Sequence, residues 1–179
     1  KPTATEICGN TIDENCDGIA ATCGDDFSNA VTVTNISQFG FGVQSSISVD
    51  LVNASNSVES PGTGNDRWYS FMATGNAVRI SLTGGSAADD NEISLYGAGS
   101  AGGSELTPLT VENAVSPSNL GTLVPAPDGG SEILYYANLV PNQNYMVCIR
   151  NVNSTPGVCT MSIGFLRASQ ADILPFTAN

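Results

Sequence analysis

Short runs of β-branched and aromatic residues, each ended by Gly, Pro, Asn or Ser, follow one another from Phe27 to Leu166. Turn signals such as Pro61-Gly62 and Pro141-Asn142 separate these runs. No window of helical length carries a sustained apolar stripe with helical spacing. The pattern is typical of an antiparallel β-sandwich with a jelly-roll or Greek-key topology. It predicts an all-β chain with strands at residues 30–35, 42–51, 67–73, 77–83, 92–97, 106–111, 132–139, 144–151 and 158–166.

The first 26 residues differ from this body in composition. They hold six of the 17 acidic residues and three of the five cysteines, with almost no apolar periodicity. Such a segment is too short and too polar to form a core, so disulfides or a metal ion must hold it together. We therefore expect a calcium-binding and disulfide-linked loop segment at 1–26, a β-sandwich domain at 27–168 and a C-terminal tail at 169–179.

The charge of the chain excludes several classes of function. Its formal net charge is −12, it has no histidine, and its five basic residues are scattered, which leaves no basic stripe for nucleic acid or anionic membranes. Without histidine, a Ser/His/Asp or Cys/His active site and a His-ligated zinc site cannot form. No apolar run of about 18 residues is present, so we expect no membrane insertion. We expect a protein that is not an enzyme.

The cysteines indicate an oxidising compartment. None of the five forms a Cys-x-x-Cys pair, and clustered cysteines in a chain rich in Gly, Ser and Asn favour disulfides in a secreted, extracellular or cell-surface protein. Cys148 and Cys159 flank a turn signal at 153–157, and hairpin pairing would place both sulfurs on one face. The apolar pattern on both faces leaves the register open. A bridge between Cys148 and Cys159 is the pairing that locality favours. Because the chain begins at Lys1 without a signal-peptide pattern, we expect a mature protein or an excised segment.

The strongest chemical signal lies near the N-terminus. Asp13, Asn15, Asp17 and Gly18 have the Asp-x-Asn-x-Asp-Gly spacing that opens a calcium loop of the EF-hand type. A hard cation takes six to eight oxygen ligands at about 2.3–2.6 Å, and alternate side chains of a tightly turned loop converge on one point. The spacing therefore predicts Ca²⁺ as the cofactor.

The second half of this loop departs from the EF-hand rule. The carbonyl of Ile19 falls at the backbone-ligand position, but the twelfth position is Gly24, where the rule requires a bidentate Glu. Asp25 and Asp26 follow at once and are candidates to close the site with a shifted geometry. The alternative interpretation is a solvated, turn-rich leader without a metal.

The same stretch resembles the short cysteine-containing metal-binding repeat of secreted bacterial proteins. The resemblance covers about a dozen residues, and Thr11 stands where the repeat usually has Gly. It implies that the ion is calcium, and that Cys8 pairs with Cys16 or Cys23. The residues that fall on the pattern are Cys8, Asn10, Asp13, Asn15, Cys16, Asp17 and Gly18.

Residues 24–166 resemble, more loosely, the bacterial pre-peptidase C-terminal domain and related secreted jelly-roll modules. Such modules are noncatalytic appendages of exported proteins. The strings that carry the resemblance are residues 24–30, 65–71, 93–97 and 139–147.

Two further features have a functional and a structural interpretation. Trp68, the single tryptophan, is either a platform on which a sugar stacks or an anchor of the sandwich core, and its mid-strand position favours the core. Asp89, Asp90 and Glu92 are a glycosidase pair, a second cation site or a turn before a strand. Because adjacent strand residues point to opposite faces, the turn is favoured.

We therefore expect a noncatalytic, calcium-stabilised extracellular module of a secreted or cell-surface bacterial protein, acting in adhesion or surface assembly. Its expected partners are other surface proteins or glycans, or further copies of itself. The alternatives are a carbohydrate-binding module of a secreted hydrolase and a structural subunit of an extracellular fibre.

Overall fold

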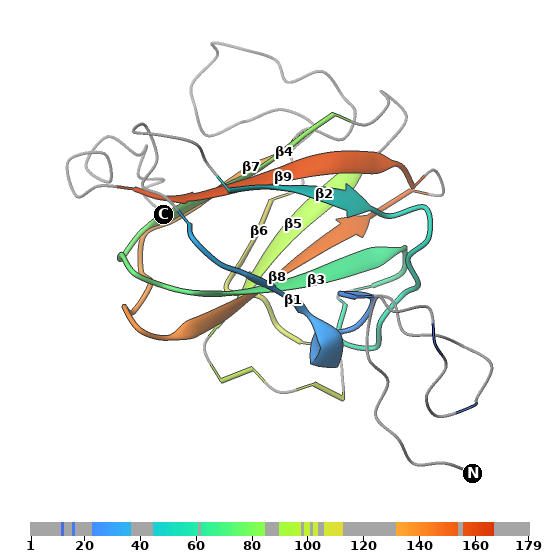
Figure 1. Cartoon of the computed structure of the whole chain (residues 1–179), viewed down its shortest axis with the longest axis horizontal. Coiled ribbons are helices and arrows are strands. Elements are labelled where there is room, and N and C mark those ends of the chain that lie inside the picture. The colour runs from blue at the N-terminus through green and yellow to red at the C-terminus, as the bar shows by residue number, and fades with distance from the viewer. Residues whose placement is uncertain are drawn as a thin grey trace.

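The structure, a computed structural model, describes residues 12, 16, 23–36, 45–60, 62–84, 90–97, 99–100, 102–103, 106–112, 132–153 and 156–166. Within this part of the chain it contains two β-sheets packed as layers and one short 3₁₀ helix, η1 (Phe27–Asn29) (Figure 1). The described residues include no helix that is long and apolar enough to cross a membrane. The strands are β1 (Val31–Val33), β2 (Ser45–Asp50), β3 (Asp66–Met72), β4 (Val78–Thr83), β5 (Asn91–Tyr96), β6 (Thr110–Glu112), β7 (Ile133–Tyr136), β8 (Asn144–Asn151) and β9 (Val158–Phe165).

The strand order shows how the two layers are connected. One sheet has the order β1-β3-β8-β5-β6 and the other the order β2-β9-β4-β7. All neighbouring pairs are antiparallel except β1 and β3, which are parallel. Apart from β5 and β6, no two neighbours in these sheets follow one another along the chain, as crossing connections of a Greek-key sandwich require. The predicted all-β sandwich is confirmed, and each predicted strand range overlaps one of these strands.

The main core lies between the two layers. Alternate residues of each strand point inward, such as Tyr69 and Phe71 of β3 and Ile80 and Leu82 of β4. Phe71 stacks against Tyr145 of β8, with ring centroids 5.8 Å apart. Each fully buried aliphatic or aromatic side chain of this kind contributes about 1.5–3 kcal/mol. This core fixes which face of β3 and β8 looks toward the second sheet.

A second, smaller cluster covers the outer face of the five-stranded sheet. Trp68, Tyr96 and Cys148 are fully buried there, and Phe27 of η1 packs on Trp68 edge-on with centroids 5.3 Å apart. All six residues of β5 are buried in consequence. β5 is therefore covered on both faces, as are the first residues of β3 and the last residues of β8.

The predicted hairpin between Cys148 and Cys159 is wrong. β8 lies between β3 and β5, whereas β9 lies between β2 and β4, so the two strands belong to different sheets. Cys148 faces the outer cluster and Cys159 faces the core between the layers. The two sulfurs are not bonded to each other. Two consecutive strands with a short connection can cross between layers, and sequence locality alone does not reveal this.

Candidate metal centre and its attachment to the sandwich

Most of the predicted metal ligands lie outside the described residues. This holds for Asp13, Asn15, Asp17 and Ile19, whose role in binding calcium stays a prediction. In the part of the chain that the structure describes, no three Asp, Glu, Cys or His residues lie together in a group that could hold a metal ion. What the structure does show is how the chain directly after this motif attaches to the sandwich.

We call residues 23–30 the docking segment, because they lie against the first residues of β3 (Figure 1). The carbonyl of Gly24 accepts a hydrogen bond of 2.6 Å from the backbone N–H of Trp68, and the N–H of Gly24 donates to the carbonyl of Asn29. Gly24 has φ +75°, and a Cβ placed on it would lie 2.8 Å from the carbonyl oxygen of Trp68. Glycine is therefore required here for both conformation and space.

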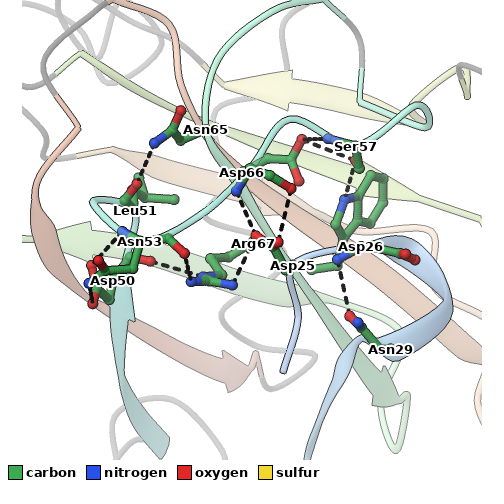
Figure 2. Close-up of polar contacts among 12 residues, drawn as sticks. Asp25, Asp26, Asn29, Asp50, Leu51, Asn53, Ser57, Asn65, Asp66 and Arg67 are labelled. Atoms are coloured by element: carbon green, nitrogen blue, oxygen red, sulfur yellow. Dashed lines mark hydrogen bonds and ion pairs between the residues drawn. The ribbon is translucent and has the colours of Figure 1, made fainter. Parts of the chain in front are cut away.

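Asp25 is bound by the sandwich through both of its carboxylate oxygens (Figure 2). Oδ1 accepts from the N–H of Ser55 at 2.6 Å and from Nη1 of Arg67 at 3.1 Å, and Oδ2 accepts from the hydroxyl of Ser55 at 2.9 Å. The Arg67 side chain is 6% exposed and that of Asp25 is 25% exposed. This partly buried ion pair joins the docking segment to β3 and to the loop after β2.

Asp26 begins the 3₁₀ helix. Its Oδ1 accepts from the N–H and the hydroxyl of Ser28, each at 2.7 Å, and its own N–H donates to the side chain of Asn29. This is a capping box, which satisfies the backbone donors at a helix start. The sequence signal was the Asp-Phe-Ser-Asn string, an Asx cap three residues ahead of a second amide side chain. Whether Asp26 also ligates a metal stays a prediction.

The cysteines near the N-terminus are described in part. Cys23 is disulfide-bonded, and Cys16 is exposed. Cys8 lies outside the described residues, so the pairing of Cys8 with Cys16 or Cys23 stays a prediction. Of the two candidate partners, Cys23 is the one seen in a bridge. The bridge places a covalent constraint next to Gly24.

A buried carboxylate that the sequence analysis did not single out, Asp66, lies at the start of β3. Its Oδ2 accepts from the N–H and the hydroxyl of Ser57 at 2.9 and 3.0 Å, and that hydroxyl accepts from the indole N–H of Trp68 at 2.8 Å (Figure 2). Among the described residues its Oδ1 has no hydrogen-bond partner. Burial raises the pKa of Asp66 to about 6, although the hydrogen bonds from Ser57 oppose this shift.

A second buried carboxylate, Glu92, is paired. Nη2 of Arg150 lies 3.0 Å from both Oε1 and Oε2 of Glu92, and Nη1 of Arg150 donates to the carbonyl of Thr63. Glu92 is 6% exposed, which leaves it out of reach of a substrate. Asp89 lies outside the described residues, and the backbone carbonyl of Asp90 accepts from the N–H of Val152. Glu92 is therefore part of the sheet and not half of a glycosidase pair.

Trp68 is fully buried, so it cannot act as a sugar-stacking surface. It is an anchor, as its mid-strand position predicted, but it packs on the outer face of the sheet and not between the layers. The residues that matter most here and were not singled out are Asp66, Arg67 and Arg150. The sequence does contain a signal for them, because they are charged residues within or next to apolar strand patterns. Charged residues that are buried need partners, so such positions predict buried ion pairs or hydrogen bonds.

The comparisons with known proteins agree with the motif at the N-terminus. Residues 1–21 match the model of the Cu-binding MopE family, described as a "Putative metal-binding motif". The resemblance of this stretch to a metal-binding repeat is thereby confirmed. The match covers a small part of the chain, and it names a metal site without showing which ion this chain binds. A search of the curated proteins finds no match.

Two solved structures are similar to the chain at low sequence identity. One is the pre-peptidase C-terminal domain of a collagenase from Bacillus anthracis, with 13% identity, a TM-score of 0.45, and coverage of 75% of this chain and 93% of the other. The second is PliG of Aeromonas hydrophila, a periplasmic inhibitor of g-type lysozyme, with 16% identity, a TM-score of 0.38, and coverage of 77% and 98%. At these TM-scores neither likeness carries an argument, although the first neighbour is the kind of domain that the sequence strings resemble.

Proposed function

We propose that the chain is a noncatalytic extracellular module in which a calcium ion, bound by residues 1–21, stabilises the N-terminal end of a β-sandwich. The observation that carries this proposal is the match of residues 1–21 to a metal-binding motif that continues directly into the docking segment. As a module of a secreted or surface protein it would act in adhesion or surface assembly, with surface proteins, glycans or its own copies as partners.

The donor set of the motif favours calcium over copper. Asp13, Asn15 and Asp17 supply carboxylate and amide oxygens, and the chain has no histidine. Oxygen ligands suit hard cations, whereas copper sites use imidazole, thiolate or thioether ligands. Cys23, the motif's neighbour, is in a disulfide and is not a thiolate ligand. The residues present therefore fit a calcium ion, which would neutralise part of the concentrated acidic charge of this segment.

The noncatalytic part of the proposal is supported by the state of the buried acids. Catalytic carboxylates must reach a substrate. Asp66 is fully buried, and Glu92 is buried against Arg150. Glu59, also buried, accepts a hydrogen bond from the N–H of Gly103. Each of these acids serves the packing of loops on the outer face of the sheet.

Neither alternative gains support from the described residues. The carbohydrate-binding alternative relied on an exposed aromatic side chain, and Trp68 is buried. The fibre-subunit alternative stays a prediction.

Calorimetric titration of the full chain with CaCl₂, together with thermal melts, tests the calcium proposal. At a calcium concentration of 100 times Kd, binding to the folded state adds about 2.7 kcal/mol to the free energy of unfolding. For a chain of this size that corresponds to an increase in Tm of roughly 5–10 °C, reversed by a chelator.

The double variant Asp13→Asn/Asp17→Asn is expected to lose both the binding heat and the Tm shift. Asp90→Asn removes an acidic charge from an exposed position outside the motif, and it should behave as the wild type. The absence of heat and of any Tm shift at millimolar calcium would contradict the proposal, as would binding of CuSO₄ in place of CaCl₂.

A further inference from the structure

We propose that Arg67 is a positioning residue for the metal site. Through Asp25 it holds the C-terminal end of the metal-binding motif on the sandwich, and it thereby raises the affinity of residues 1–21 for the ion. This inference rests on the proposed calcium function and adds a residue of the sandwich to it.

The guanidinium of Arg67 is held in place before Asp25 is considered. Nε donates to the carbonyl of Asp50 at 2.9 Å, and Nη2 donates to the carbonyl of Asn53 at 2.9 Å (Figure 2). Both acceptors belong to the backbone at the end of β2 and in the loop after it. The remaining nitrogen, Nη1, is thus directed at Asp25, 3.1 Å away. A planar guanidinium fixed in this way loses little further freedom when it binds a carboxylate.

Asp25 is better suited to anchor the segment than to ligate the ion. Its two oxygens already accept three hydrogen bonds, from Ser55 and Arg67. A cation bound to Oδ1 would also lie next to the guanidinium, and like charges at that distance repel each other. We therefore assign Asp25 to attachment and not to the ligand set.

The anchor is close to the motif along the chain. Only residues 22–24 separate the end of the matched motif from Asp25. Of these, Cys23 is in a disulfide and Gly24 is bonded to the backbone of Trp68. Fixing one end of a loop reduces the conformational entropy that the loop loses when its ligands converge on an ion. The docked segment should therefore bind calcium more tightly than the undocked one.

Calorimetry with CaCl₂ on the full-length variants Asp25→Asn and Arg67→Gln tests this inference. Both variants are expected to bind calcium about 5- to 50-fold more weakly than the wild type, a range typical of coupling between linked sites. The double variant should be no weaker than the weaker single variant, because the two side chains act through one contact. Asp90→Asn serves again as the matched loss of one acidic charge.

The direction in which Arg67→Gln changes the calcium affinity distinguishes an anchoring role of Asp25 from a ligand role. Removing a positive charge beside a cation site strengthens calcium binding if Asp25 is itself a ligand, whereas loss of positioning weakens binding. Tighter or unchanged binding by Arg67→Gln would overturn the inference. If that variant does not fold, as judged by circular dichroism, Ser55→Ala takes its place, because it removes one donor to Asp25 without changing a charge. Unchanged affinity of that variant is equally contradictory. Absence of binding by the wild type would refute the calcium proposal and this inference together, and it is seen before any variant is tested.

Discussion

Asp25 and Asp66 show how differently one residue type behaves at two places near the start of β3. Asp25 receives a guanidinium and two donors from Ser55. Asp66, fully buried, receives donors from Ser57 on one oxygen only. A buried carboxylate without a cation holds its proton more tightly, because burial penalises the charged form. The stability of the fold should therefore depend on pH through Asp66.

The variant Asp66→Asn is expected to be more stable than the wild type at pH 7. The folded state holds the proton of Asp66 up to about pH 6, while the unfolded chain releases it near the ordinary pKa of 3.8. The free energy of unfolding of the wild type therefore falls as pH rises between these values, by about 3 kcal/mol in all. An amide at this site avoids that penalty but buries an N–H₂ group, so we expect a net gain of about 1 kcal/mol at pH 7. Denaturant unfolding at pH 7 and pH 4 measures it.

Asp50→Asn is the control, because it is expected to change the stability at pH 7 in the opposite direction. Hydrogen bonds, first from the side chain of Asn53 and then from the backbone of Asn53 and Val52, lower the pKa of Asp50. Its contribution to stability is present at neutral pH and is lost as pH falls through that lowered pKa. Asp50→Asn should therefore destabilise at pH 7 and have no effect once the wild-type carboxylate is protonated. A wild-type unfolding free energy that does not fall between pH 4 and pH 6 would contradict the assignment to Asp66.

At the scale of elements, the strands were predictable and their partners were not. The alternation of β-branched and aromatic residues locates β3, β4, β8 and β9 because it reflects burial of one face. The register of β8 was left open for a physical reason. Tyr145, Val147 and Ile149 face the core, and Met146 and Cys148 on the other face pack on the outer cluster. A strand that is covered on both faces has no polar side that could fix its orientation.

The candidate site also has one part that the sequence predicts and one part that it does not. The acid-rich motif was readable because calcium ligands keep a fixed spacing in one short segment. The contacts of Asp25 with Ser55 and Arg67 join residues 30 and 42 positions apart, and no local pattern encodes them. The same is true of the pair Glu92 and Arg150. Such contacts follow from strand order, which the sequence does not reveal by spacing.

The loop that leads into β3 closes tightly over the end of β8, and a pair of glycine variants tests this closure. A Cβ on Gly64 would overlap the carbonyl oxygen of Asn151, and Gly64 has φ +131°. Gly84 also has a positive φ, of +85°, but nothing lies within 4 Å of its Cβ position. We expect Gly84→Ala to lose about 1 kcal/mol for its backbone conformation alone, and Gly64→Ala to lose about 3 kcal/mol or more. Equal losses in urea denaturation would show that the loop is not closed on β8.

At the scale of the whole molecule, one face of the five-stranded sheet is covered by the second sheet, and part of the other face is covered by the docking segment and loops. Three of the arginines, Arg67, Arg79 and Arg150, lie inside strands of this body. Cleavage at a strand requires local unfolding, which is rare in a cooperative domain. Resistance to cleavage after these three arginines therefore shows whether both sheets stay folded.

Native trypsin digestion is expected to make no cut after Arg67, Arg79 or Arg150, so that the chain up to Arg167 stays in one fragment. The same protein digested after denaturation in urea should be cut at all three positions, which is the control for protease access. Mass spectrometry of the fragments distinguishes the outcomes. A native fragment that ends at Arg79 would show that β4 opens independently of the other strands.

The attachment of the docking segment also has a mechanical consequence. A pull on the chain before Cys23 reaches the sandwich first at Gly24 and Asp25, which are bonded to β3, and not at β1. The backbone bond to Trp68, the ion pair with Arg67 and the edge contact of Phe27 must all break before tension passes along the parallel pair of β1 and β3. For a module tethered through its N-terminal side, the short edge strand β1 is thus shielded from tension.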